Sequence, residues 1–194
     1  MLRVGITGGI GSGKTTVCSI FEKLGAPVYY ADLKAKELVN TNLELQNKIT
    51  LAFGHNSFIE GAYNRAFIAS IVFSDKEKLK LLNSIIHPFV LNDWGKFCQQ
   101  YANKTYVLKE AAIMLETESK NSVDYIVLVH SPMELRVQRI QERDGVSKSE
   151  IEARINAQMS EDEKLKLADS VIRNDQKHSL IEQVLTLHQK FILL

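Results

Sequence analysis

The residues with the clearest chemical potential stand near the start of this sequence. Gly8-Gly9-Ile10-Gly11-Ser12-Gly13-Lys14-Thr15 fits the pattern G-x-x-x-x-G-K-[ST], which is typical of a phosphate-binding loop. Glycines let the backbone approach an oxyanion without a Cβ in the way, and the amides of residues 11–16 would form a nest at a helix start. Lys14 would bridge the β- and γ-phosphates, and the Thr15 hydroxyl would ligate Mg²⁺. The candidate nucleotide-binding residues are Gly9, Gly11, Ser12, Gly13, Lys14, Thr15 and Thr16.

The flanks of this loop decide between a phosphate site and a chance glycine-rich turn. A phosphate loop requires a strand before it and a helix after it, and Leu2–Thr7 and Lys14–Leu24 have those patterns. A guanine-reading Asn-Lys-x-Asp is missing, since Asn47-Lys48-Ile49-Thr50 lacks the Asp, and no D-x-x-G sequence occurs. These observations favour a small kinase over a GTPase.

Asp32 follows the second predicted strand, Val28–Tyr30, and has two interpretations. In a parallel sheet this strand ends at the same edge as the phosphate loop. A carboxylate there could orient an acceptor hydroxyl and take its proton. Alternatively, Asp32 caps a helix that begins at Leu33, a position that Asp favours. On the residues alone the two interpretations have equal weight.

Three arginines share one face of the helix predicted over 134–143, namely Arg136, Arg139 and Arg143. Such a face could close over a triphosphate and stabilise charge in the transition state. The alternative is a solvated face that glutamates of the same helix balance, and for Arg136 we favour this alternative. Two residues of the next predicted helix could join such a lid, Arg154 and Gln158.

Composition narrows the class of protein. The chain has 194 residues, of which 45% are hydrophobic and 24% charged, as in an ordinary globular domain. The net charge of +1 predicts no global attraction to nucleic acid or to anionic membranes. We find no membrane span and no signal segment, and the two cysteines, Cys18 and Cys98, have no pairing or zinc spacing. We therefore expect a protein of the reducing cytoplasm, with Cys18 in the core.

Strands and helices alternate along the chain. Five short apolar segments predict strands: Leu2–Thr7, Val28–Tyr30, Thr105–Leu108, Tyr125–Val129 and Ser170–Ile172. Helical spacing is found in Lys14–Leu24, Lys34–Val39, Leu43–Phe53, Arg65–Phe73, Asp75–Ile86, Phe89–Tyr101, Glu134–Arg143, Lys148–Met159 and Ser179–Phe191. No convincing strand interrupts the helices between the second and third strands, and Asn56–Asn64 is the clearest break there. The pattern predicts a parallel α/β sheet covered on both faces, with Glu110, after the third strand, as a weak candidate for organising Mg²⁺.

Over nearly its whole length the chain resembles the dephospho-CoA kinase family. The resemblance rests on the loop version of Val4–Thr16, on Asp32, and on the order and spacing of several later segments. These are Asn64-Arg65 with Ile71-Val72-Phe73, His87-Pro88, Arg139, Arg143-Asp144-Gly145, Arg154, Gln158, Ala168-Asp169, Val171-Ile172 and Asn174. Two departures stand out. Ala112-Ile113-Met114-Leu115-Glu116 replaces the family's Pro-Leu-Leu-Phe-Glu, and His130 stands where the fourth strand often ends in Asp.

The resemblance implies an α/β, three-layer P-loop NTPase of the nucleotide-kinase type, with a five-stranded parallel sheet, a helical substrate-binding insert and a helical lid. The nucleotide-binding core would comprise residues 1–31, 103–137 and 164–194, the CoA-substrate domain 32–102, and the lid 138–163.

The resemblance also implies an activity, the transfer of the γ-phosphate of ATP, with Mg²⁺, to the ribose 3′-hydroxyl of dephospho-CoA. This reaction is the last step of coenzyme A synthesis. Asp32 would be the catalytic base, assisted by Lys14 and Arg139. Arg65 and His87 would contact the acceptor, and Arg139 and Arg143 would close over ATP.

Two rival functions stay open at this point. Another small-molecule kinase would hold a different acceptor, such as a nucleoside or nucleotide, in the helical insert. A nucleotide-dependent binding module would need a protein partner, but no tail, basic run or coiled-coil repeat supports one. We expect ATP and dephospho-CoA as the partners, no nucleic acid or membrane, and a monomer or small homo-oligomer.

Overall fold

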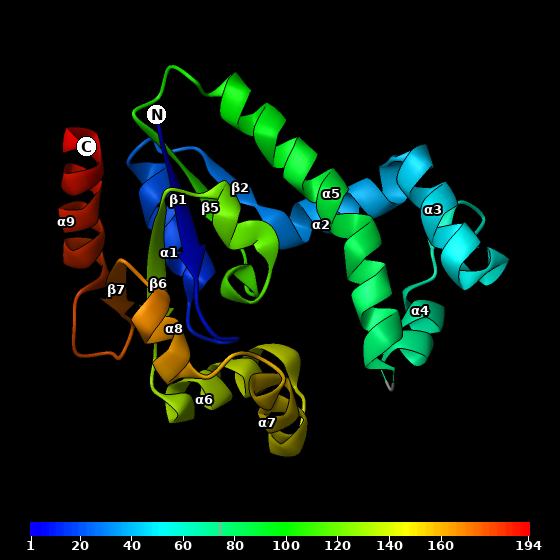
Figure 1. Ribbon diagram of the computed structural model, residues 1–194. Coiled ribbons are helices and arrows are strands. Elements are labelled where there is room, and N and C mark those ends of the chain that lie inside the picture. The colour runs from blue at the N-terminus through cyan, green and yellow to red at the C-terminus, as the bar shows by residue number, and fades with distance from the viewer. Residues whose placement is uncertain (74) are drawn as a thin grey trace. The chain divides into compact units, whose positions relative to one another are not determined.

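The computed structural model describes residues 1–73 and 75–194, and the chain divides into two units (Figure 1). The sheet unit consists of Met1–Tyr30 and Cys98–Leu194, and the helical unit consists of Ala31–Phe97. Each unit has its own apolar core, described separately below.

The sheet unit is built on five parallel strands in the order β2-β5-β1-β6-β7. Their bounds are β1 Leu2–Thr7, β2 Val28–Tyr30, β5 Tyr106–Glu110, β6 Tyr125–His130 and β7 Ser170–Arg173. The prediction of a five-stranded parallel sheet is confirmed. However, β5 runs two residues further than predicted, so Lys109 and Glu110 belong to the strand rather than to the loop after it. Both charged residues are buried, which apolar patterning could not reveal.

The helices of this unit follow the strands in a three-layer α/β fold, and two of them, α1 Lys14–Lys23 and α9 Leu180–Leu193, cover one face of the sheet. The others are α6 Met133–Asp144, α7 Lys148–Asn156 and α8 Glu161–Leu167, with short 3₁₀ turns at Met114–Glu116 and Glu118–Ser122. The sequence analysis missed α8, a short and largely polar helix that a capping box between Ser160 and Glu163 starts. Within residues 1–73 and 75–194, no helix has both the length and the apolar character that crossing a bilayer requires.

One face of the sheet packs against α1 and α9. Alternate strand residues point to this side because side chains of a strand alternate between faces. They meet apolar residues of α1 and α9. Cys18 is fully buried here, as predicted. Phe191 is at the centre, with its ring 6.2 Å from Phe21 and 5.2 Å from Tyr125 between centroids.

On the opposite face the two 3₁₀ turns lie close to the central strand. A Cβ on Gly5 of β1 would collide with the Met114 sulfur, so the absence of a side chain lets this turn lie flat on the sheet. Lys109 is 1% exposed on this face, and its Nζ donates to Ser122 Oγ at 3.0 Å.

The helical unit contains α2 Ala31–Thr41, α3 Leu43–Phe53, α4 Arg65–Val72 and most of α5 Lys76–Gln100. Its core consists of Val39, Leu45, Ile49, Ile68 and Leu82 with partly buried neighbours. Two predictions were wrong here. A small antiparallel hairpin, β3 Phe58–Ile59 and β4 Ala62–Tyr63, occupies the predicted break after the turn His55–Ser57. The two helices predicted over 75–101 form a single helix, because α5 continues through Pro88.

Replacing Phe191 with Ala should lower the free energy of unfolding by about 3–5 kcal/mol, because the substitution leaves a cavity among packed rings. Urea denaturation measures this loss. The matched control is Ile192→Ala, next in the same helix and 49% exposed, which should change stability far less. Equal effects of the two substitutions would contradict this packing.

Burial lowers the pKa of Lys109 to about 8, from 10.5. The unfolded state therefore binds more protons than the folded state between pH 8 and 10.5, and the Lys109 contribution to stability rises with pH over that window. Lys109→Met should raise the free energy of unfolding at pH 7 by about 1–3 kcal/mol. Ser122 Oγ keeps Ser119 O as its acceptor.

Urea titrations of the wild type and Lys109→Met at pH 7 and pH 10 give this difference directly. The advantage of the variant should shrink at the higher pH. An advantage that is constant or that grows with pH would show that the lysine is not desolvated in the folded state.

Candidate functional site

The candidate site is the phosphate loop, residues 8–15, which connects β1 to α1. Its backbone needs glycine, because Gly11 and Gly13 have φ of 78° and 94°. Helix α1 begins at Lys14, and within the described chain no side-chain oxygen caps its first turn. The first amides of a helix have no partner inside the helix, so those of α1 are available to an anion.

Five consecutive carbonyl oxygens of the loop accept side-chain hydrogen bonds, two from Lys14 of the loop itself and three from residues outside the loop. Lys14 Nζ donates to Gly8 O at 3.0 Å and to Gly9 O at 3.4 Å, Arg136 Nε to Ile10 O at 2.9 Å, Arg139 Nη1 to Gly11 O at 3.4 Å, and Asn174 Nδ2 to Ser12 O at 2.8 Å. In a planar trans peptide the carbonyl and the next N–H point in opposite directions. A donor that binds one carbonyl therefore makes the N–H of the next residue point away from that donor. This applies to the N–H groups of Gly11 and Gly13, which follow the bound carbonyls of Ile10 and Ser12.

Close packing against the loop also requires glycine at positions 9, 11 and 13. A Cβ on Gly9 would overlap the guanidinium of Arg136, and a Cβ on Gly13 would overlap the Asn174 amide. A Cβ on Gly11 would lie 2.7 Å from the Arg136 carbonyl oxygen. Helix α6 and the residue after β7 thus contact the loop at positions where only hydrogen fits.

The side chains of the loop differ in burial. Those of Thr15 and Thr16 are exposed, so the Thr15 hydroxyl can reach a bound ion. The Ser12 hydroxyl is buried, and among the described residues it has no hydrogen-bond partner. Leaving a buried hydroxyl unpaired costs about 1–3 kcal/mol. Together with the loop amides, this hydroxyl fits a site for an oxyanion such as a phosphate.

Of the predicted lid arginines, Arg139 contacts the loop, whereas Arg143 pairs with Asp144. Arg139 spans the loop and the end of β7, with Nη1 3.0 Å from Ser131 Oγ and Nη2 3.2 Å from Asn174 Oδ1. Arg143 instead forms two bonds to its neighbour Asp144, at 2.7 and 2.9 Å, and this contact lowers the pKa of that carboxyl.

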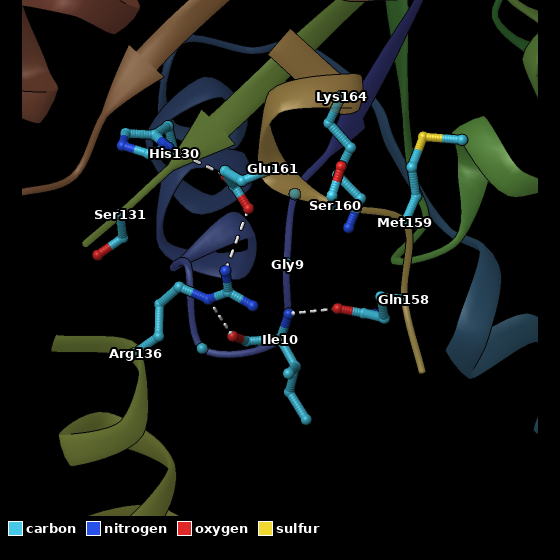
Figure 2. Close-up of polar contacts among 12 residues, drawn as sticks. Gly9, Ile10, His130, Ser131, Arg136, Gln158, Met159, Ser160, Glu161 and Lys164 are labelled. Carbon is cyan, nitrogen blue, oxygen red and sulfur yellow. Dashed lines mark hydrogen bonds and ion pairs between the residues drawn. The ribbon is translucent and has the colours of Figure 1, made fainter. Parts of the chain in front are cut away.

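Arg136 contradicts the sequence-based preference for a solvated position. Its exposed fraction is 5%. It donates to the loop at Ile10 and forms an ion pair with Glu161 of α8 (Figure 2). Gln158, predicted to join a lid, accepts the Ile10 N–H at 3.0 Å. A helical face alone cannot show that the loop lies against Arg136, and its partner Glu161 lies in the helix that the sequence analysis missed.

Asn174 was not predicted as a site residue, although it belongs to the last-strand motif. It directly follows β7, where a parallel strand delivers side chains to the edge that carries the loop. Its amide group contacts both Ser12 and Arg139. An asparagine side chain directly after the last predicted strand was the feature of the sequence that could have indicated this site residue.

The predicted acceptor-side residues all lie in the helical unit and are exposed. Asp32 is in the first turn of α2, and because this helix begins at Ala31, the alternative that Asp32 caps it is wrong. Arg65 is the first residue of α4, which Asn64 caps. His87 lies within α5, immediately before Pro88.

Two glutamates, Glu110 and Glu116, lie at and after the end of β5. Glu110 ends β5, in register with Ile6 of β1. Burial is the main cause that raises the pKa of Cys18 in α1, and the negative charge of Glu110 adds to it. The Glu110 carboxylate is thus close to α1, the helix that follows the phosphate loop. Glu116 instead accepts the Met159 N–H at 2.9 Å and lies 3.7 Å from Lys164 Nζ of α8.

Comparisons with known proteins agree with this geometry. The family model of dephospho-CoA kinase matches residues 2–179. The chain belongs to the dephospho-CoA kinase family. A dephospho-CoA kinase of Bacteroides fragilis is 37% identical over 186 residues, covering 96% of this chain and 91% of the relative.

Solved structures show the same relationship. A crystal structure of a Thermus thermophilus protein superposes with a TM-score of 0.84 at 33% identity, covering 97% of this chain and 96% of the other. Dephospho-CoA kinase from Campylobacter jejuni has a TM-score of 0.70 at 25% identity, with coverage of 98% and 97%. The predicted fold, enzyme class and family are therefore confirmed. This is an ATP-using P-loop kinase of the family that phosphorylates dephospho-CoA in the last step of coenzyme A biosynthesis.

Replacing Gly13 with Ala should weaken ATP binding at least about tenfold, because the new Cβ overlaps the Asn174 amide and displaces the loop. Isothermal titration calorimetry measures the affinity. Gly25→Ala is a matched control. Gly25 has a comparable φ of 84° but no atom within 4 Å of the added Cβ, so the control carries only the backbone strain. Loss of binding in both variants alike would mean that strain, not the Asn174 contact, is responsible.

Proposed function

We propose that this chain transfers the γ-phosphoryl group of ATP to the 3′-hydroxyl of the ribose of dephospho-CoA, yielding ADP and coenzyme A, in the cytoplasm and with Mg²⁺. The observation that carries the proposal is the phosphate loop. In this chain of the dephospho-CoA kinase family, side chains from outside the loop bind the carbonyls of Ile10, Gly11 and Ser12. The N–H of the residue after each carbonyl therefore points the opposite way. Fixed amides stabilise charge without reorganising during the reaction.

ATP would bind through Gly9, Gly11, Ser12, Gly13, Lys14, Thr15 and Thr16. Lys14 now donates to neutral carbonyls of Gly8 and Gly9, both within its own loop. A phosphate oxygen would be a stronger acceptor, because it adds the attraction between opposite charges to the hydrogen bond. Lys14 would therefore move from the carbonyls to the bridging region between the β- and γ-phosphates.

The protein oxygens near the start of α1 fit a magnesium–nucleotide complex. Mg²⁺ keeps several waters and takes only one or two protein ligands besides phosphate oxygens. The exposed Thr15 hydroxyl would be the direct ligand, and Glu110 would orient bound water. When bound, the ion neutralises charge on the β- and γ-phosphates.

Asp32 would be the base of the reaction. Its exposed carboxylate follows β2 by two residues, and β2 ends in the same direction as β1. The 3′-oxygen attacks the γ-phosphorus, the bond from that phosphorus to the β,γ-bridging oxygen breaks, and the hydroxyl proton passes to Asp32. Holding the oxygen in line with the leaving group supplies much of the rate.

The other predicted residues would bind and enclose the reactants. Arg65 and His87 would contact the acceptor, and Arg139 and Arg143 would close over ATP and exclude water. Arg139 is already at the loop, so the step required of it is an exchange of partners rather than a long movement. Residues 1–31, 103–137 and 164–194 would form the core, 32–102 the CoA-substrate domain and 138–163 the lid, in a monomer or small homo-oligomer.

Replacing Asp32 with Asn should lower kcat by about 10²–10⁴-fold, the usual contribution of a general base. ATP affinity should stay within about twofold of wild type, a change worth less than 0.5 kcal/mol. Coupled detection of ADP gives kcat, and calorimetry gives ATP affinity.

Asp162→Asn is the matched control, since Asp162 is also an exposed carboxylate in the first turn of a helix. It should leave both quantities unchanged. An Asp32→Asn enzyme with near-wild-type kcat would remove Asp32 from the role of base.

A further inference from the structure

Both backbone polar groups of Ile10, at the tip of the phosphate loop, are held by side chains from outside the loop (Figure 2). Gln158 Oε1 accepts the N–H at 3.0 Å, and Arg136 Nε donates to the carbonyl at 2.9 Å. The two contacts fix two successive peptide planes, Gly9–Ile10 and Ile10–Gly11. The second plane contains the Gly11 N–H.

Arg136 is itself held in place. Its Nη1 lies 3.1 Å from Glu161 Oε2, and the other oxygen of that carboxylate lies 3.0 Å from His130 Nδ1. The guanidinium also packs on the bare α-carbon of Gly9. Because a planar guanidinium presents its donors in a rigid fork, one group spans Ile10 and Glu161 and leaves the loop little freedom.

The charges around this contact are balanced. Burial lowers the pKa of Arg136, and Glu161 opposes that effect. Lys164 of α8 is 1% exposed, its pKa is lowered by burial, and Glu116 and Glu161 oppose that change. Removing one member of such a buried set leaves a charge unpaired, which costs more than the pair itself contributes.

We propose that Arg136 is a positioning residue for phosphoryl transfer, which holds the Ile10 carbonyl so that the Gly11 amide faces the bound triphosphate, and that Glu161 fixes Arg136 in this role. The inference rests on the proposed function, because it requires the loop to bind ATP. Arg136 touches neither ATP nor the acceptor and acts through the peptide plane. Gln158 and Glu161 are only three residues apart, so a single short segment sets both contacts to Ile10.

The test compares Arg136→Met, Arg136→Lys, Glu161→Gln and the control Arg173→Met, an exposed arginine at the end of β7 that is outside this contact. Four quantities are measured for each: Tm, the calorimetric affinity for Mg-ATP well below Tm, KM for ATP, and KM for dephospho-CoA. Arg136→Lys decides between positioning and stability, because an ammonium can keep the ion pair with Glu161 but cannot span Ile10 as well.

Arg136→Met should weaken ATP affinity and raise its KM about tenfold or more, as expected for a lost charged hydrogen bond. The KM for dephospho-CoA should not change. In Arg136→Lys, Tm should recover while ATP affinity stays weakened, and Glu161→Gln should show a smaller loss of affinity.

The inference is overturned if the folded Arg136 variants bind ATP within twofold of wild type, or if ATP affinity recovers together with Tm in Arg136→Lys. Should Arg136→Met fail to fold, Arg136→Lys and Glu161→Gln still decide. Failure of the proposed function looks different, because the wild-type protein itself would then not bind Mg-ATP or phosphorylate dephospho-CoA.

Discussion

The hydrogen bonding of three consecutive loop carbonyls by side chains from outside the loop is the constraint on which the rest of this site depends. Donors from α6 and from the residue after β7 hold the oxygens of residues 10–12. A glycine-rich segment is conformationally free in the unfolded chain, so its glycines alone do not fix the direction of its amides. The surrounding donors supply that direction, and the glycines supply the space in which the donors approach.

The parallel sheet brings these donors together from distant parts of the sequence. The strands β1, β6 and β7 run side by side, so the phosphate loop, the start of α6 and Asn174 all follow the same ends of adjacent strands. Segment 158–161 reaches the same loop through Gln158 and, with Arg136, through Glu161. The buried packing of α1 on the sheet fixes the position of the helix that follows the loop.

The sequence was informative where one local rule sets the outcome. The loop motif, the five strands and most helices follow from glycine spacing and apolar periodicity, and the family follows from the order of short motifs. Other features depend on tertiary contacts that no local pattern contains. Arg136 has the pattern of a surface residue but is buried against Ile10. Lys109 and Glu110 extend a buried strand, and α5 continues through Pro88 because packing outweighs one lost backbone bond. The capping box at Ser160 could have revealed α8.

Phosphoryl transfer from ATP to the 3′-hydroxyl of dephospho-CoA can be observed by mass spectrometry of the purified wild-type protein with Mg-ATP. Dephospho-CoA, adenosine and a nucleoside monophosphate serve as parallel acceptors. We expect dephospho-CoA alone to gain one phosphate, with coenzyme A as the product. Phosphorylation of another acceptor, with dephospho-CoA untouched, would rule this activity out.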